Sequence, residues 1–289
     1  MRTISERRKA YDGYISQLKM GNKEFMPIIN KNFDNGNPFD FGRTSADYAK
    51  YRDVYPPEFY NRLAELKIGV GGQKILDLGT GTGVLPRNMY RFGGQWIGTD
   101  ISENQIQYAK ELSQKAGMEI EYLVSASEAL DFPAESFDVV TACQCFMYFD
   151  KKIIVPKIHK WLKTNGHLAV LFMAWLPDES AIAAKSEELV LKYNPDWTGA
   201  HWQRSAVVEP DWASGFFSLA NAVAFDVPVR FTRESWHGRI KSCRGIGASS
   251  LTETKIANWE KEHLAYLQTV PEQFDILHYV TILDLKKLN

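Results

Sequence analysis

Lys74-Ile-Leu-Asp-Leu-Gly-Thr-Gly-Thr-Gly83 decides the fold of this chain, and Gln95-Trp-Ile-Gly-Thr-Asp100 follows it closely. The apolar start of the first stretch predicts a buried strand, which ends at three glycines spaced two residues apart. An amphipathic segment from Val84 to Arg91 predicts a helix, and a second strand ends at Asp100. This pattern indicates the nucleotide-binding half of a doubly wound α/β domain, because glycines let the backbone approach a ligand and a strand-end carboxylate accepts hydrogen bonds from ribose.

The residue ahead of the glycines indicates which nucleotide is bound. Asp77 stands near the place where a dinucleotide puts its pyrophosphate, and a carboxylate there would repel phosphate. S-adenosylmethionine carries an α-ammonium and a sulfonium instead, so the same carboxylate attracts it. The glycine spacing agrees, since Gly79-x-Gly81-x-Gly83 differs from the G-x-G-x-x-G of dinucleotide folds. The alternative is an ordinary strand-to-helix turn, which the second acidic residue, Asp100, disfavours.

On these residues the chain resembles the class I S-adenosylmethionine-dependent methyltransferases of the small-molecule type, and it is similar to the trans-aconitate methyltransferase-like group. The stretch 77–83 looks like the cofactor loop of that family, and 127–140 looks like its adenine-side loop and fourth strand. The resemblance runs from about Asp47 to Phe172. It departs at Ala126, where the family often has an Asp that contacts the adenine amino group.

The resemblance implies a set of cofactor contacts. The glycine loop would hold the methionine end, Asp100 the ribose, and Ile101 and Glu128 would flank the adenine. Arg52 lies in a segment that closes over the cofactor in the same relatives and could pair with the methionine carboxylate, although an amphipathic helix with packed tyrosines is the alternative. The implied cofactor-binding residues are Tyr48, Arg52, Asp77, Gly79, Thr80, Gly81, Gly83, Asp100, Ile101, Gln105, Ser127, Glu128 and Gln144.

Composition narrows the range of partners. The 289 residues carry a formal net charge of −1 without a lysine or arginine tract, which argues against a nucleic-acid substrate. Neither an apolar stretch of membrane-spanning length nor a signal-peptide core is present, so we expect no membrane association. Three cysteines do not suggest a disulfide framework, and we therefore expect a reduced, cytoplasmic setting.

Strands alternate with helices as far as residue 173, and the alternation fails after Ala174, where prolines and tryptophans punctuate the chain. We expect an α/β fold with a Rossmann-like, doubly wound seven-stranded sheet, mostly parallel with an antiparallel last strand, and a helical cap insertion. The antiparallel end is implied by the resemblance. The predicted parts are an N-terminal arm or lid at 1–46, the S-adenosylmethionine-binding core at 47–174, a cap insertion over the substrate site at 175–220 and the C-terminal part of the core sheet, with inserted helices, at 221–289.

The end of the fourth strand should lie beside the reacting methyl group, because ligands of open α/β sheets bind at the carboxyl ends of the strands. In-line displacement at a carbon activated by sulfonium needs alignment and a desolvated pocket rather than a metal, and no ligand spacing suggests one. Relatives often carry His-Trp where this chain has Met147-Tyr148, which removes a candidate base. The candidate catalytic residues are Gln144, Tyr148, His201 and His237, of which Gln144 could equally cap backbone and each histidine could be structural.

Aromatic and basic residues after the core suggest a substrate pocket. The arginine-rich stretch 230–244 indicates an anionic substrate, and a solvated helix face is the alternative. Cys143 and Cys145 could bind a thiophilic substrate or could simply be buried. The candidate substrate-binding residues are Tyr51, Trp175, Trp202, Arg233 and Arg239.

The sequence thus predicts transfer of a methyl group from S-adenosylmethionine to a small-molecule acceptor by direct displacement, which yields S-adenosylhomocysteine. A non-catalytic S-adenosylmethionine-binding protein is one alternative, and an NAD(P)-dependent oxidoreductase, which Asp77 disfavours, is another. We expect a monomer or a homodimer.

Overall fold

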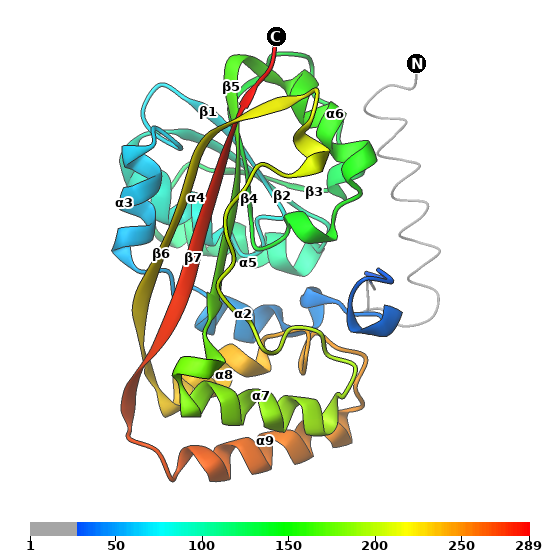
Figure 1. Ribbon diagram of the computed structural model, residues 1–289, viewed down its shortest axis with the longest axis vertical. Helices are drawn as coiled ribbons and strands as arrows, with labels where there is room; N and C mark the ends of the chain where they lie inside the picture. The colour runs from blue at the N-terminus through cyan, green and yellow to red at the C-terminus, as the bar shows by residue number, and fades with distance from the viewer. Residues whose placement is uncertain (1–27) are drawn as a thin grey trace.

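A seven-stranded sheet in the order β3-β2-β1-β4-β5-β7-β6 forms the centre of the computed structural model, which describes residues 28–289 (Figure 1). The first five strands are parallel, whereas β7 is antiparallel to both β5 and β6. This arrangement confirms the predicted fold class. The strands are β1 Lys74–Leu78, β2 Gln95–Asp100, β3 Glu121–Val124, β4 Phe137–Cys143, β5 Leu162–Trp175, β6 Phe217–Thr232 and β7 Gln273–Lys287.

Helices follow most of the parallel strands, as the alternation predicts. Helix α5 begins at Ser102, whose hydroxyl accepts a hydrogen bond from the Gln105 backbone N–H at 3.3 Å. The helices are α2 Ser45–Tyr51, α3 Pro57–Glu65, α4 Val84–Met89, α5 Glu103–Lys115, α6 Lys151–Trp161, α7 Ala181–Tyr193, α8 Arg233–Lys241 and α9 Glu253–Leu267.

The two faces of the sheet are covered by different helices. On one face Phe59 of α3 and Leu85 of α4 pack in one cluster with Ile75 of β1. On the other face Ile158 of α6 packs in one cluster with Leu76. Successive residues of β1 therefore enter opposite halves of the core, as a strand buried on both faces requires.

Strands β5, β6 and β7 have 14, 16 and 15 residues, whereas β1 has five. These three long strands extend beyond the ends of β1 to β4 and reach a layer formed by α7, α8 and α9 (Figure 1). Trp236 of α8 is fully buried there, and its indole N–H donates to the Ser186 hydroxyl of α7 at 2.9 Å. The cap layer therefore includes helices from 233–267 as well as the segment 175–220 that the sequence singles out. Most of the predicted arm, residues 1–27, lies outside the described residues.

Trp236→Ala is expected to lower the free energy of unfolding by about 3–5 kcal/mol, because it empties a buried indole site and leaves the Ser186 hydroxyl without that donor. Leu264→Ala is the control: this α9 residue is 44% exposed, and a loss below about 1 kcal/mol is expected. Urea denaturation followed by circular dichroism measures both. Equal losses in the two variants would contradict the packing of the cap described here.

Candidate active site

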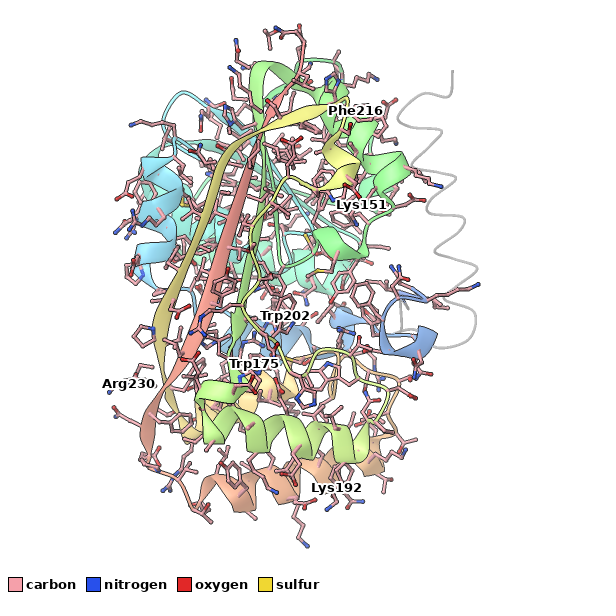
Figure 2. The ribbon with its side chains drawn as sticks, in the orientation of Figure 1. Lys151, Trp175, Lys192, Trp202, Phe216 and Arg230 are labelled. Carbon is pink, nitrogen blue, oxygen red and sulfur yellow. The ribbon has the colours of Figure 1, made fainter. Side chains whose placement is uncertain are left out.

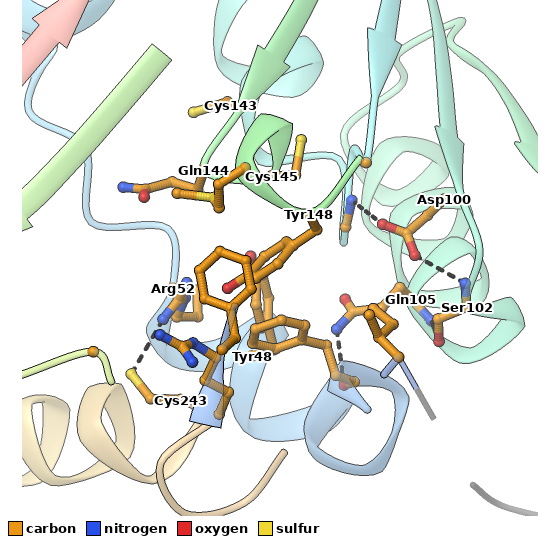
Figure 3. Close-up of a pocket in the computed structure, with 18 of the residues that line it drawn as sticks. Tyr48, Arg52, Asp100, Ser102, Gln105, Cys143, Gln144, Cys145, Tyr148 and Cys243 are labelled. Carbon is orange, nitrogen blue, oxygen red and sulfur yellow. Dashed lines mark hydrogen bonds between the residues drawn. The ribbon is translucent and has the colours of Figure 1, made fainter. Parts of the chain in front are cut away.

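A cavity of about 310 Å³ lies where the parallel strands end, between the sheet and the cap. The loops after β1, β2 and β4 line one side, and α2, α8 and the segment after α7 line the other (Figure 3). This is the edge at which open α/β sheets bind ligands. Within residues 28–289, no group of three or more His, Cys, Asp or Glu side chains is arranged to hold a metal ion.

The glycine turn after β1 presents bare backbone to the cavity. Gly79 and Gly81 line it with φ angles of +61° and +58°, which L side chains adopt only at a cost. A Cβ on Gly79 would lie 2.7 Å from the Cys145 sulfur, whereas a Cβ on Gly81 would meet only the Tyr48 ring, at 3.4 Å. Glycine is therefore required for the turn at Gly79 and for open space at Gly81.

Asp100 joins this turn to the start of α5. Its two carboxylate oxygens accept hydrogen bonds from the backbone N–H groups of Gly81 and Ser102, each at 2.9 Å (Figure 3). Burial raises the pKa of Asp100 to about 6. Each oxygen keeps lone-pair capacity on the cavity side, which fits the two hydroxyls of a ribose.

Asp77 does not line the cavity. Its carboxylate is buried within the sheet, where it accepts a hydrogen bond from the Thr141 hydroxyl of β4 at 2.6 Å. Burial raises the pKa of Asp77 to about 7. The direct attraction to the cofactor that the sequence suggests is thus not what the geometry provides, because the side chain turns toward the neighbouring strand rather than over the turn.

Thr80 and Gly83 also lie outside the cavity lining. The Thr80 backbone N–H bonds to the Thr99 carbonyl at 2.8 Å, so this residue joins the turn to β2. Gly83 precedes α4 with a φ of +74°, and a Cβ there would lie 2.4 Å from the Tyr122 hydroxyl. Both residues shape the turn instead of contacting what it encloses.

The predicted adenine side is assembled at the start of α5 and after β3. Ile101, Gln105, Ser127 and Glu128 all line the cavity, as does Ala126. The Gln105 side-chain N–H donates to the Phe41 carbonyl at 3.0 Å, while its carbonyl oxygen is buried and has no hydrogen-bond partner among residues 28–289. Gln105 thus lines the cavity with other atoms, while this oxygen is enclosed by protein.

The loop after β4 brings Gln144 and Tyr148 to the cavity. Gln144 has a φ of +64° and its side-chain amide donates to the Met173 carbonyl, so it is held in place by backbone. Its own carbonyl oxygen accepts no hydrogen bond from the described residues. Burial raises the pKa of Tyr148 to about 12, which keeps the phenol protonated at neutral pH.

Helix α2 supplies Tyr48 and Arg52 to the cavity, and the Arg52 guanidinium lies 4.7 Å from the centroid of the Tyr48 ring. Tyr51, which the sequence also suggests, points away from the cavity and donates to Glu234 of α8 at 2.9 Å. The placement of Tyr48 and Arg52 agrees with the expected closing segment, and Tyr51 fixes that segment to the cap.

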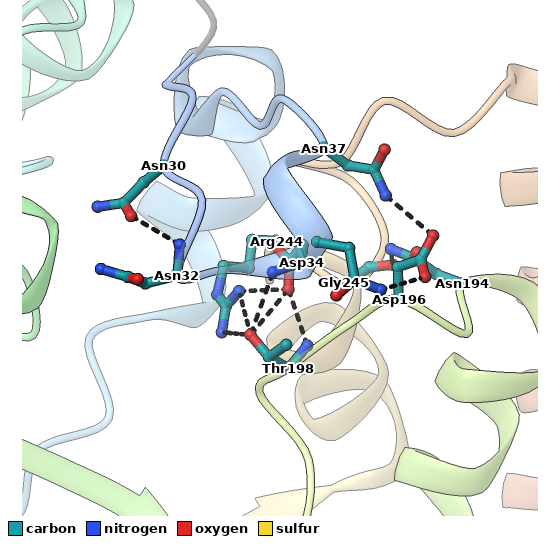
Figure 4. Close-up of polar contacts among 10 residues, drawn as sticks. Asn30, Asn32, Asp34, Asn37, Asn194, Asp196, Thr198, Arg244 and Gly245 are labelled. Atoms are coloured by element: carbon teal, nitrogen blue, oxygen red, sulfur yellow. Dashed lines mark hydrogen bonds and ion pairs between the residues drawn. The ribbon is translucent and has the colours of Figure 1, made fainter.

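Residues 28–41 close the cavity from the N-terminal side (Figure 4). Asp34 is buried, forms an ion pair with Arg244 and accepts a hydrogen bond from the Thr198 backbone N–H at 2.8 Å. The Phe33 ring lies 5.0 Å from the Tyr148 ring, centroid to centroid. Sequence patterns do not predict Phe33, Asp34 or Thr198 as part of the site. Asp34 contacts Thr198 and Arg244 across more than 150 positions, and contacts at such separations leave no local pattern.

The cap contributes an aromatic wall. Trp175, Trp197 and Trp202 line the cavity, and Figure 2 shows Trp175 and Trp202 between the sheet and the cap helices. The Trp175 indole N–H donates to Glu187 at 2.6 Å, and the Trp202 ring lies 4.5 Å from that of Phe172. Trp175 and Trp202 are thus where the substrate prediction puts them.

Neither histidine proposed as a base reaches the cavity. The His201 side chain is 76% exposed; its backbone N–H donates to Glu187 at 2.8 Å, and its Nδ1 lies 3.8 Å from the same carboxylate. His237 packs between α8 and α9, where its Nδ1 lies 2.9 Å from Nδ1 of His263. Lone histidines at a loop tip and in a helix interface are structural here, and we propose no catalytic role for either.

The arginine-rich stretch divides between solvent and cavity. Arg233 faces outward, donates to the Val270 carbonyl at 2.9 Å and lies 3.5 Å from Glu272, so it does not reach the cavity. Arg239 is one helical turn and a half further along α8, is 5% exposed and lines the cavity. Arg244 also lines the cavity but is paired with Asp34, so Arg239 is the residue of this stretch that best fits the prediction of an anion-binding arginine.

All three cysteines line the cavity as free thiols. Burial raises the pKa of Cys143 to about 12 and that of Cys145 well above its usual range, so both stay protonated. The Cys145 thiol donates to the Leu78 carbonyl at 2.9 Å and the Cys143 thiol contacts the Tyr55 hydroxyl. Packing accounts for Cys143 and Cys145 without a thiophilic ligand.

Comparison with known proteins identifies the part of the chain that carries this site. Residues 76–170 match the family described as "Methyltransferase domain". Over these residues the chain is similar to methyltransferase domains. The match confirms the resemblance to class I S-adenosylmethionine-dependent methyltransferases, and S-adenosylmethionine as the cofactor.

Among curated relatives, the ubiquinone biosynthesis O-methyltransferase of Bradyrhizobium diazoefficiens is 33% identical over 162 residues, 55% of this chain and 62% of that protein. The enzyme of the same name from Brucella ovis is 28% identical over 62% of this chain and 72% of its own. The alignment thus spans less than two thirds of the length of the first of these relatives.

Two solved structures share the fold. A Bacillus halodurans protein described as a candidate methyltransferase is 18% identical and aligns over 80% of this chain and all of its own, with a TM-score of 0.51. The YcgJ protein of Bacillus subtilis is 16% identical and aligns over 80% and 99%, with a TM-score of 0.50. Separately, no helix within residues 28–289 is long and apolar enough to span a bilayer.

The buried carboxyl of Asp77 predicts a pH dependence of stability. Because its folded pKa of about 7 exceeds the ordinary 3.8, the folded state retains a proton that the unfolded state releases between these values, and Asp77 destabilises the fold as the pH rises through 4 to 7. Asp77→Asn keeps an acceptor for Thr141 and cannot ionise. Its stability relative to wild type should therefore rise with pH in this window, by up to about 1.4 kcal/mol per unit.

Urea midpoints of the two proteins from pH 4 to 8 measure this difference. Burial lowers the pKa of His263 to about 3 and that of His278 to about 4, so both histidines give the opposite slope below pH 6.5. Their contribution is common to both proteins and cancels in the comparison. A difference that does not change with pH would show that Asp77 titrates normally.

Proposed function

We propose that this chain transfers a methyl group from S-adenosylmethionine to a small-molecule acceptor by direct displacement. The observation that carries the proposal is the Asp100 carboxylate, held by the N–H groups of Gly81 and Ser102 at the edge of a cavity that a bare glycine turn faces. Neither a non-catalytic binding role nor NAD(P)-dependent chemistry gains support from the fold or from the matched domain.

The cavity fits the parts of this cofactor in order along its length. Asp100 accepts hydrogen bonds from the ribose hydroxyls, and Ile101 and Glu128 flank the adenine. Ala126 lines the cavity where the family often has a carboxylate, so the adenine amino group has no side-chain acceptor at that position. Arg52 pairs with the methionine carboxylate, beside the glycine turn.

When bound, S-adenosylmethionine supplies a methyl group already activated by its positively charged sulfur. The protein then has to align the acceptor and exclude water. Gln144, fixed by the Met173 carbonyl, keeps a free carbonyl oxygen at the end of β4 and orients the acceptor through it. Tyr148, covered by Phe33, seals the same place as a neutral phenol.

The acceptor is a small molecule enclosed by the arm and the cap. Trp175, Trp197 and Trp202 give the cavity aromatic walls, which fit an acceptor with an apolar or planar body. Two relatives are named for O-methylation in ubiquinone biosynthesis, which places oxygen first among the acceptor atoms to test. We further propose that the protein is cytoplasmic, because all three cysteines are free thiols, as is usual in a reducing compartment. We also propose that it is a monomer or a homodimer.

Binding of S-adenosylhomocysteine should weaken about tenfold for each pH unit below 6, because ribose recognition needs the ionised form of Asp100. The ligand itself changes no charge between pH 5 and 8, so the profile reports the protein. Isothermal titration calorimetry from pH 5 to 8 measures the dissociation constant of S-adenosylhomocysteine. Asp100→Asn should bind weakly and without this profile, and an unchanged wild-type affinity at pH 5 would contradict the assignment of Asp100.

Gly81→Ala should reduce S-adenosylhomocysteine affinity at least tenfold with a loss of stability of about 1 kcal/mol, because the added methyl enters the cavity and the φ of +58° is tolerated at that cost. Gly117→Ala is the matched control, since its φ is +66° and a Cβ there meets nothing within 4 Å. It should lose similar stability and no affinity. Equal affinities in the two variants would contradict the position of the cofactor.

A further inference from the structure

Two guanidinium groups, that of the buried Arg239 and that of the partly buried Arg52, converge on one sulfur atom at the cap side of the cavity. Nη1 of Arg52 lies 3.3 Å from Sγ of Cys243 (Figure 3). Nη1 of Arg239 lies 3.0 Å from the same sulfur. The Arg239 guanidinium also lies 4.9 Å from the Trp175 ring. Two like charges are thus held close together in a place with little access to water.

No acidic side chain among residues 28–289 forms an ion pair with Arg52 or Arg239. Nearby arginines differ, since Arg230 is paired with Asp275 and Arg244 with Asp34. The Arg239 guanidinium makes one hydrogen bond within this part of the chain, to the weakly accepting thiol, and its Nε has no partner there. A buried charge without a counter-charge costs several kcal/mol, so this arrangement calls for an anion.

His278, near Arg239, neither supplies the missing negative charge nor adds a positive one. Burial lowers the pKa of His278 to about 4, so its ring is neutral, and the charge of Arg239 adds to this effect. Burial and the charge of Arg52 lower the pKa of Arg239, yet a guanidinium stays protonated at neutral pH. The compensating charge therefore has to arrive with a ligand.

We propose that the acceptor is a small organic acid whose carboxylate binds Arg239 while its apolar body lies against Trp175 and Phe172. This inference rests on the proposed methyltransferase function, in which Arg52 takes the methionine carboxylate of the cofactor. One guanidinium then remains for one further negative charge, which favours a carboxylate over a doubly charged phosphate. The planar guanidinium of arginine can form two parallel hydrogen bonds to a carboxylate. With the methionine carboxylate at Arg52 and the acceptor carboxylate at Arg239, the repulsion between the two guanidinium groups is offset.

The first part of the test establishes whether Arg239 binds the carboxylate of the cofactor or that of the acceptor. S-adenosylhomocysteine and 5′-methylthioadenosine share the nucleoside, and only the former carries the methionine carboxylate. The quantity measured by calorimetry is the ratio of the affinities for S-adenosylhomocysteine and 5′-methylthioadenosine. Arg52→Gln should lose most of this preference for S-adenosylhomocysteine, whereas Arg239→Gln should retain it within about twofold. A loss of that preference in Arg239→Gln would assign its anion to the cofactor and overturn the proposal.

The second arm measures acid recognition in protein saturated with S-adenosylhomocysteine. The probes are acids with their neutral amides: benzoate with benzamide, phenylacetate with phenylacetamide, and hexanoate with hexanamide. Ligand-observed NMR titration should show at least one acid binding tenfold or more tighter than its amide. Arg239→Gln should abolish that preference, and Arg239→Lys should keep part of it. Arg230→Gln, which removes an exposed arginine outside the cavity, is the control and should keep the preference in full.

The wild-type measurement alone decides the matter if Arg239→Gln does not fold. Wild type that binds S-adenosylhomocysteine and prefers no acid over its amide would overturn the organic-acid proposal and leave the methyltransferase proposal standing. Wild type that does not bind S-adenosylhomocysteine would instead overturn the function on which the inference rests.

Discussion

The position of the cavity depends on one partly buried carboxylate. Asp100 binds the backbone N–H of Gly81 on one side and that of Ser102 on the other, and so it fixes the glycine turn after β1 to the first turn of α5. Its burial is unfavourable to the charged form, as the pKa of about 6 shows. Asp100 also lines the cavity, where its oxygens can accept further hydrogen bonds. A ligand that donates to these oxygens would offset the free energy lost by burying the charge.

The opposite wall is built from segments that lie far apart along the chain. The Asp34–Arg244 ion pair and the bond from Thr198 to Asp34 tie the stretch 28–41 to both the loop after α7 and the end of α8 (Figure 4). These contacts cover Tyr148 and enclose the end of β4. An enclosed cavity suits displacement at an activated methyl group, which depends on alignment and on the exclusion of water. The enclosure also leaves Arg239 only 5% exposed, so its positive charge needs a counter-charge from a ligand.

Much of the fold and of the cofactor side was predictable from the sequence because both rest on local patterns. The strand, glycine turn and acid of the stretch 74–100 are read from spacing alone, and Gly79, Gly81 and Asp100 lie together at the cavity. Side-chain direction is not local: Asp77 turns to Thr141 on the next strand. For the same reason, helical position within the stretch 230–244 separates Arg239, which faces the cavity, from Arg233, which faces solvent. The contacts of Asp34 join parts of the chain that no sequence window compares.

A crystal structure of the protein with S-adenosylhomocysteine would test the central claim most directly. We predict ribose hydroxyls within hydrogen-bond distance of both Asp100 oxygens, the adenine between Ile101 and Glu128, and the sulfur directed toward Gln144 and Tyr148. A ligand bound elsewhere would contradict this account. So would a ligand in the cavity whose ribose makes no contact with Asp100, because the glycine turn and the carboxylate would then be structural features alone.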